Sequence, residues 1–186
     1  MQLPDGRTLG FAEYGRSDDY PLIFIHGFPT SRPETLGIDE IVLRQRIRVI
    51  TPDRNGFGLT TFDPKHTILQ WPHDIQSLGQ DLGLSRFAIL GGSGGGPFAL
   101  ACADRLSPDM LSAVGIMTGA GPWEAGTHYM ASLYRASAKM ADRWPIDGRS
   151  MALVICSSAP VALLDAEESL VFTLWSSANR QTPSQD

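Results

Sequence analysis

Cysteine, clustered positive charge and long apolar runs are all scarce in this chain of 186 residues. Its two cysteines, Cys102 and Cys156, give no basis for a disulfide framework. Lysine and arginine form no dense cluster and the net charge is −5, which argues against binding to the phosphates of a nucleic acid. The longest apolar run late in the chain, residues 151–164, is interrupted by serine and proline and is too short to cross a bilayer.

The N-terminal residues also lack the basic and then apolar layout of a secretory signal peptide. We therefore expect a cytoplasmic protein that binds neither nucleic acid nor membrane. The composition, with 42% hydrophobic and 19% charged residues, is ordinary for a globular protein with one sizeable core.

Short apolar segments alternate with helical patterns along the first two thirds of the chain. A hairpin is predicted at 3–15, strands at 20–27, 48–56, 86–92 and 110–119, and helices at 34–45, 68–84 and 95–106. This alternation predicts an α/β fold, in which a mostly parallel sheet is flanked by helices. Residues 1–120 are assigned to the core domain, and residues 121–186 to a helical region with a C-terminal tail.

Unusual residues follow three of the predicted strands. The stretch HGFPTSR begins at His26, DRNGFG at Asp53 and GGSGGG at Gly91. Ligands bind at the carboxyl ends of parallel strands in such sheets. We therefore expect the three loops to lie along one edge of the sheet and to form the functional site.

Ser93 stands within Gly91-Gly92-Ser93-Gly94-Gly95, which fits the G-x-S-x-G pattern between a strand and a helix. The turn of such a nucleophile elbow is so tight that side chains two residues before and after the serine would collide. This steric requirement explains Gly91 and Gly95. The amide of Gly94 then points to the position where an oxyanion would form.

Other glycine-rich motifs do not fit this stretch. A phosphate-binding P-loop would end in G-K-[ST], and the dinucleotide fingerprint G-x-G-x-x-G cannot be placed on GGSGGGP. The remaining alternative is a plain tight turn with a passive serine. No sequence pattern indicates a metal site or a cofactor.

The other two loops are predicted to support the serine. Gly27 gives its loop the freedom to fold back, so that the amide of Phe28 becomes the second oxyanion donor. For His26, packing within its loop is favoured over a catalytic role. Two roles are open to Asp53, a catalytic acid or a brace for its own loop, and its position before the serine in the chain favours the brace.

Together, in order and over roughly residues 3–122, these segments resemble the α/β-hydrolase superfamily. The resemblance implies that Ser93 is the nucleophile of an ester-type acyl transfer, with Phe28 and Gly94 as the oxyanion hole. It also implies a helical cap from about Gly121. The family places its acid and then its histidine after the serine. Here three histidines precede Ser93 and the fourth, His128, lies where the cap begins, so the family's base has no counterpart and the fold is expected to be incomplete.

Two functions stay open. The first is a serine hydrolase of a small ester, thioester or lactone, truncated and of low activity, that forms an acyl-enzyme on Ser93. The second is a non-catalytic binding or accessory protein with a hydrolase-like shell. A third possibility is that His73, His128 or a partner chain supplies the base. The missing strands would also leave the predicted strand 110–119 as an open edge, at which copies of the chain self-associate.

Overall fold

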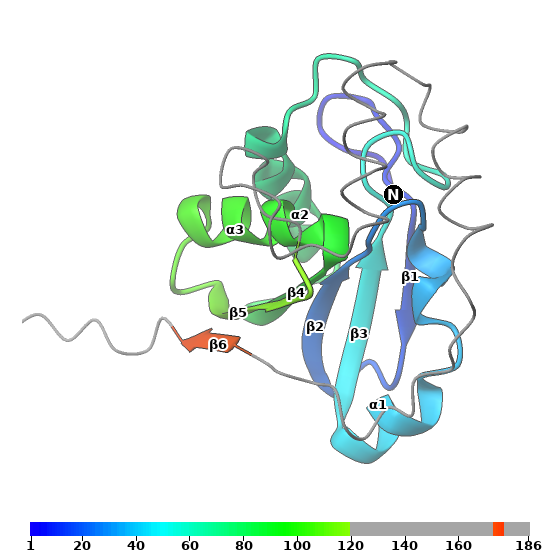
Figure 1. The fold of residues 1–186 in the computed structure, drawn as a ribbon, viewed down its shortest axis with the longest axis vertical. Coiled ribbons are helices and arrows are strands. Elements are labelled where there is room, and N and C mark those ends of the chain that lie inside the picture. Colours follow the sequence, from blue (N-terminus) through cyan, green and yellow to red (C-terminus); the bar gives the residue numbers. More distant parts are fainter. Residues whose placement is uncertain (120–172, 177–186) are drawn as a thin grey trace, which may run out of the picture. The chain divides into compact units, whose positions relative to one another are not determined.

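The computed structural model describes residues 1–119 and 173–176 (Figure 1). The strands are β1 (Phe11–Tyr14), β2 (Tyr20–Ile25), β3 (Ile47–Pro52), β4 (Phe87–Gly92), β5 (Leu111–Met117) and β6 (Thr173–Ser176). The helices are α1 (Asp39–Gln45), α2 (Trp71–Asp81) and α3 (Gly96–Arg105), with short 3-10 turns η1 (Arg32–Thr35), η2 (Ile68–Gln70) and η3 (Ser93–Gly95). All of them belong to one compact unit, and the cap-like region predicted for 121–186 lies outside the described residues apart from β6.

The strands form one mixed sheet in the order β1-β3-β2-β4-β5-β6. The four central strands, β3, β2, β4 and β5, are parallel, while β1 and β6 pair antiparallel at the two edges. Parallel strands of this kind are covered by helices on both faces, which is why their sequences are nearly continuous apolar runs. The predicted α/β fold with a mostly parallel sheet is confirmed.

The two faces of the sheet bury different side chains. Ile23 and Ile25 of β2 belong to the larger core cluster, together with residues of α2 and α3. Phe24, between them in the sequence, packs instead with Val42 of α1. Because successive side chains of a strand point to opposite faces, α2 and α3 cover one face and α1 covers the other. Within the described residues, no helix is long and apolar enough to cross a membrane.

Three local predictions differ from the structure. The predicted hairpin at 3–15 is reduced to an isolated bridge between Gln2 and Thr8, and β1 pairs with β3 instead. The predicted helix 34–45 is divided into η1 and α1, because Gly37 has a φ of +91° that a continuing helix cannot adopt. The segment before the C-terminus, predicted as helical, contains the strand β6, which pairs with Ala113–Ile116 of β5. Strand β5 is therefore not the open edge of the sheet.

Candidate active site

The loops after β2, β3 and β4 meet at one edge of the sheet. These strands are neighbours, with β2 in the centre, and all three are parallel (Figure 1). A Cβ atom placed on Gly27, after β2, would lie only 3.2 Å from the Cβ atom of Ser93, after β4. Arg54, after β3, donates a hydrogen bond from Nη2 to the carbonyl oxygen of Gly27 at 2.7 Å. The structure thus brings together residues from all three predicted loops.

Ser93 lies at the sharp turn between β4 and α3. Its φ is +46°, in the left-handed region that residues other than glycine rarely adopt, and its side chain is exposed. A Cβ atom on Gly91 would lie 2.7 Å from the carbonyl oxygen of Gly95, and one on Gly95 would overlap the carbonyl oxygen of Ile25. Glycine at both positions therefore allows the turn to pack against β2 and α3.

The amide of Phe28 lies beside this turn. Its nitrogen is 3.4 Å from the position that a Cβ atom on Gly94 would occupy. Within residues 1–119 and 173–176, the Phe28 N–H has no hydrogen-bond acceptor. A donor of this kind, close to an exposed serine, is a structural requirement of an oxyanion hole.

His26 is fully buried and both of its ring nitrogens are engaged. Nε2 accepts a hydrogen bond from the backbone N–H of Arg54 at 2.9 Å, and Nδ1 lies 2.9 Å from the carbonyl oxygen of Gly27. Because Nε2 is an acceptor, the ring proton belongs on Nδ1, which donates to that carbonyl. Burial, reinforced by the charge of Arg54, lowers the pKa of His26 to about 4. At neutral pH the ring is uncharged, and neither nitrogen is available to Ser93.

The carboxylate of Asp53 is buried and holds two loops in place. It accepts hydrogen bonds from the backbone N–H of Arg32 at 2.7 Å and from that of Leu59 at 2.9 Å. The guanidinium of Arg32 pairs with the same carboxylate at 2.6 Å. A Cβ atom on Gly58 would overlap this carboxylate, so glycine lets the loop close over it. These partners connect Asp53 to loop backbone and to Arg32.

Sequence reasoning missed Glu34, which follows the predicted oxyanion loop. Its Oε2 accepts hydrogen bonds from the backbone N–H of Gly27 at 2.8 Å and from the hydroxyl of Thr30 at 2.6 Å. The segment HGFPTSRPE folds back through η1, so that a carboxylate seven residues along the chain reaches the Gly27 amide. No periodic pattern signals such a return.

Arg54 was also missed as a site residue. Its side chain is buried, and its guanidinium lies over two aromatic rings, 4.7 Å from the centroid of Phe57 and 4.9 Å from that of Phe98. Burial lowers the pKa of Arg54 to about 10, so the side chain stays charged at neutral pH. The available signal was an arginine directly after the end of a buried strand. The sequence alone does not reveal that its side chain points back into the site.

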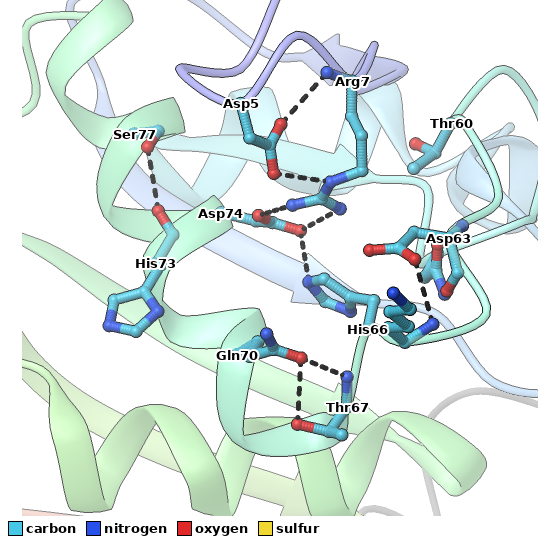
Figure 2. A network of polar contacts seen from close by, with 12 residues as sticks. Asp5, Arg7, Thr60, Asp63, His66, Thr67, Gln70, His73, Asp74 and Ser77 are labelled. Carbon is cyan, nitrogen blue, oxygen red and sulfur yellow. Dashed lines mark hydrogen bonds and ion pairs between the residues drawn. The ribbon is translucent and has the colours of Figure 1, made fainter.

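The other described histidines serve elsewhere. His66 Nε2 lies 3.0 Å from a carboxylate oxygen of the buried Asp74, which also binds the guanidinium of Arg7 (Figure 2). His73 is exposed on α2, and its backbone carbonyl accepts a hydrogen bond from Ser77. Among the residues that the structure describes, no histidine is hydrogen-bonded to Ser93.

His128, another predicted candidate for the base, lies outside the described residues. Over the described part of the chain, no group of three or more histidine, cysteine, aspartate or glutamate side chains is arranged to hold a metal ion.

Comparison with protein families identifies the same architecture. A model of the alpha/beta hydrolase fold family matches residues 20–182. Over 130 residues, 65% of this chain and 46% of the relative, the sequence is 32% identical to a 2-hydroxymuconate semialdehyde hydrolase of Pseudomonas putida. Over 145 residues, 70% of this chain and 49% of the relative, it is 26% identical to a proline iminopeptidase of Lactobacillus helveticus.

A solved structure supports the same assignment. A thermophilic esterase from Thermogutta terrifontis superposes with a TM-score of 0.59 at 27% sequence identity, over 78% of this chain and 51% of that one. The chain spans about half the length of the curated relatives that it matches.

Proposed function

The chain belongs to the α/β-hydrolase fold family, and from this premise we propose that it is a serine hydrolase of a small ester, thioester or lactone. The observation that carries the proposal is Ser93 itself, exposed on a turn with a φ of +46°. The amide of Phe28 and the turn residue Gly94 lie beside it. A strained nucleophile next to an unoccupied amide donor is the arrangement that acyl transfer requires.

The proposed reaction has two steps. The Ser93 hydroxyl oxygen attacks the substrate carbonyl carbon, and its proton passes to a general base and then to the departing alcohol or thiol. The tetrahedral intermediate places its negative oxygen at the amides of Phe28 and Gly94. A water molecule then attacks the acyl-enzyme, which releases the acid and restores the Ser93 hydroxyl.

The names of the relatives favour a hydrolytic reaction, since they are a hydrolase, an iminopeptidase and an esterase. The esterase favours an ester among the candidate substrates. In the family, the acid and the histidine follow the nucleophile along the chain. The proposed base is therefore an imidazole from outside the described residues.

A second candidate function is non-catalytic binding by a hydrolase-like shell. It is favoured by one observation: in the described part of the chain, each histidine is engaged elsewhere or exposed, and none bonds to Ser93. Without a base, the oxyanion hole and substrate binding alone leave about 10³–10⁴-fold catalysis over water.

Labelling by a fluorophosphonate separates the two functions. This reagent reacts with serines that a base and an oxyanion hole activate, and hardly with ordinary serines. We expect an adduct in the intact mass of the folded protein and none in Ser93→Ala, with folding of both verified by circular dichroism. Absence of an adduct on folded protein would reject the hydrolase and favour the binding protein. An adduct that persists in Ser93→Ala would show that another residue is the nucleophile.

A further inference from the structure

The carbonyl group of Gly27 accepts hydrogen bonds from two buried side chains. Arg54 donates from Nη2 at 2.7 Å, and His26 donates from Nδ1 at 2.9 Å. The hydroxyl of Thr30 is also within reach at 3.1 Å, but its single hydrogen has a closer, charged acceptor in Glu34 at 2.6 Å. Two donors, one of them a guanidinium, therefore fix the direction of this carbonyl.

This carbonyl belongs to the same peptide unit as the N–H of Phe28. The peptide bond between Gly27 and Phe28 is trans. In a planar trans peptide the C=O and N–H bonds point in opposite directions. Holding the oxygen of Gly27 on one side consequently directs the Phe28 N–H to the other side. The Phe28 nitrogen itself lies 3.4 Å from the position of a Cβ atom on Gly94.

Gly27 needs such restraint. A Cβ atom at this position would lie 3.2 Å from that of Ser93, so a side chain would crowd the nucleophile. Glycine avoids the contact but has more backbone freedom than any other residue. The N–H of Gly27 is held by Glu34 at 2.8 Å, and its C=O is held by Arg54 and His26. Both peptide units around the glycine are therefore fixed.

The guanidinium of Arg54 is suited to this task by its surroundings. It is 7% exposed, lies over the rings of Phe57 and Phe98, and forms no ion pair within the described residues. Besides Gly27, its hydrogen-bond partner is the carbonyl oxygen of Gly94 at 3.5 Å, and its Nε has no partner in the described part of the chain. A buried cation without a carboxylate partner is costly to keep. Here it contacts the carbonyl oxygens of Gly27 and Gly94, in the two loops that carry the predicted oxyanion donors.

We propose that Arg54 is the positioning residue of the oxyanion hole, which sets the direction of the Phe28 N–H by holding the carbonyl of Gly27. The inference rests on the proposed function, because it takes Ser93 as the nucleophile. Arg54 acts through the backbone of the Gly27–Phe28 peptide unit.

The first experiment observes the peptide unit itself. The chain holds 8 phenylalanines, and a glycine precedes Phe11, Phe28 and Phe57. A protein labelled with carbon-13 at the glycine carbonyls and nitrogen-15 at the phenylalanine amides therefore gives three NMR signals, one for each Gly–Phe peptide unit. The signal that disappears in Phe28→Leu belongs to the Gly27–Phe28 unit. A hydrogen bond to a carbonyl deshields its carbon and the nitrogen of the same peptide. In Arg54→Gln we expect both nuclei of the Gly27–Phe28 unit to move upfield, while the Gly10–Phe11 unit stays unchanged.

The second experiment measures whether the direction of that amide matters for the reaction. An oxyanion hole prefers a negative oxygen to a negative sulfur. We therefore compare hydrolysis of 4-nitrophenyl acetate with that of its thionoester. Loss of one oxyanion donor costs about 10²–10³-fold in rate. We expect Arg54→Gln to lower the oxoester rate by about 10²-fold and the thionoester rate much less. A smaller fraction of folded enzyme would lower both rates equally.

The controls keep the outcomes distinct. Arg48 lies at the other end of β3 and pairs with Glu13. Arg48→Lys should therefore leave the NMR signals and the ratio of oxoester to thionoester rates unchanged. If Arg54→Gln does not fold, Arg54→Lys replaces it, because an ammonium keeps the charge but not the planar fork of the guanidinium. Absence of Ser93-dependent labelling in the wild type rejects the proposed function, and Arg54 is then judged on the NMR shifts. Unchanged shifts, or shifts with an unchanged rate ratio, overturn the role of Arg54.

Discussion

At the scale of single residues, Gly95 is the position where the elbow is most sensitive to added volume. Its φ of −78° suits any residue, so alanine there would bring no backbone strain. The added Cβ atom would instead overlap the carbonyl oxygen of Ile25, which is held in β2 opposite Gly91 of β4. We expect Gly95→Ala to lower the free energy of unfolding by about 3 kcal/mol, at the upper end of overpacking costs. Urea denaturation would measure the change.

The control for Gly95→Ala is Gly83→Ala. Gly83 has a φ of +65° and no atom within 4 Å of an added Cβ atom. Its substitution therefore tests backbone strain alone, which costs about 1–2 kcal/mol. Equal losses in both variants would show that the contact with Ile25 relaxes, and that the packing of the elbow does not demand glycine at position 95.

The buried ring of His26 makes stability depend on pH. Burial, together with the charge of Arg54, lowers its pKa from the ordinary 6.5 to about 4. Between pH 6.5 and about pH 4, the unfolded chain therefore binds more protons than the folded chain. The contribution of His26 is present in full above pH 6.5 and is lost as the pH falls toward 4. This difference corresponds to about 3 kcal/mol.

Urea denaturation between pH 4 and pH 7 would measure that contribution. We expect the stability of the wild type to fall more steeply with decreasing pH than that of His26→Gln, whose side chain does not titrate. The variant is less stable at pH 7 but has the flatter profile. Parallel profiles for the two proteins would contradict the placement of a neutral, buried imidazole at this position.

At the scale of elements, a buried ion pair connects the N-terminal segment to α2. Arg7 donates two hydrogen bonds to the carboxylate of Asp74, at 2.6 and 3.1 Å (Figure 2). The Asp74 side chain is only 5% exposed, so loss of Arg7 leaves a buried charge whose remaining partner is the ring of His66, at 3.0 Å. Breaking a buried pair from one side costs about 3–5 kcal/mol. We expect Arg7→Met, which keeps most of the apolar stem, to lower stability by about 3 kcal/mol in thermal or urea unfolding.

Arg16→Met provides the matched control for this pair. Arg16 pairs with Asp18, two residues along the chain, and both side chains are exposed (67% and 71%). Exposed pairs contribute little, because water and salt screen them. We expect no measurable change in stability. A similar loss in Arg7→Met and Arg16→Met would show that burial of Asp74 is not what makes the pair matter.

The core elements could be predicted from the sequence because each depends on a local pattern. The strands predicted at 20–27 and 86–92 are β2 and β4 in the structure, and their ends differ from the prediction by at most two residues. The steric demand for glycine around Ser93 is likewise local. The contacts of Arg54 and Asp74 could not be predicted, because each side chain meets partners from distant parts of the chain. Such contacts depend on how the elements pack, and no short pattern encodes them.

At the scale of the whole molecule, the edge of the sheet was predicted wrongly. The sequence predicts an unpaired edge at 110–119, because residues 121–186 show a helical pattern and no further strand. In the structure β6 pairs antiparallel with β5, from Ala113 to Ile116. The four residues of β6 are too few to show a periodic pattern in the sequence. Their extended conformation depends on pairing with the edge of β5.

Two shortened chains test whether β6 protects the sheet from self-association. A chain that ends at residue 176 keeps β6, and one that ends at 172 lacks it, so that the backbone groups of β5 face solvent. Open edges of parallel sheets pair with other chains. We expect the 172-residue chain to form dimers or larger species as its concentration rises, in light scattering coupled to gel filtration, and the 176-residue chain to self-associate less. Equal behaviour of the two chains would show that the pairing of β6 with β5 does not determine the oligomeric state.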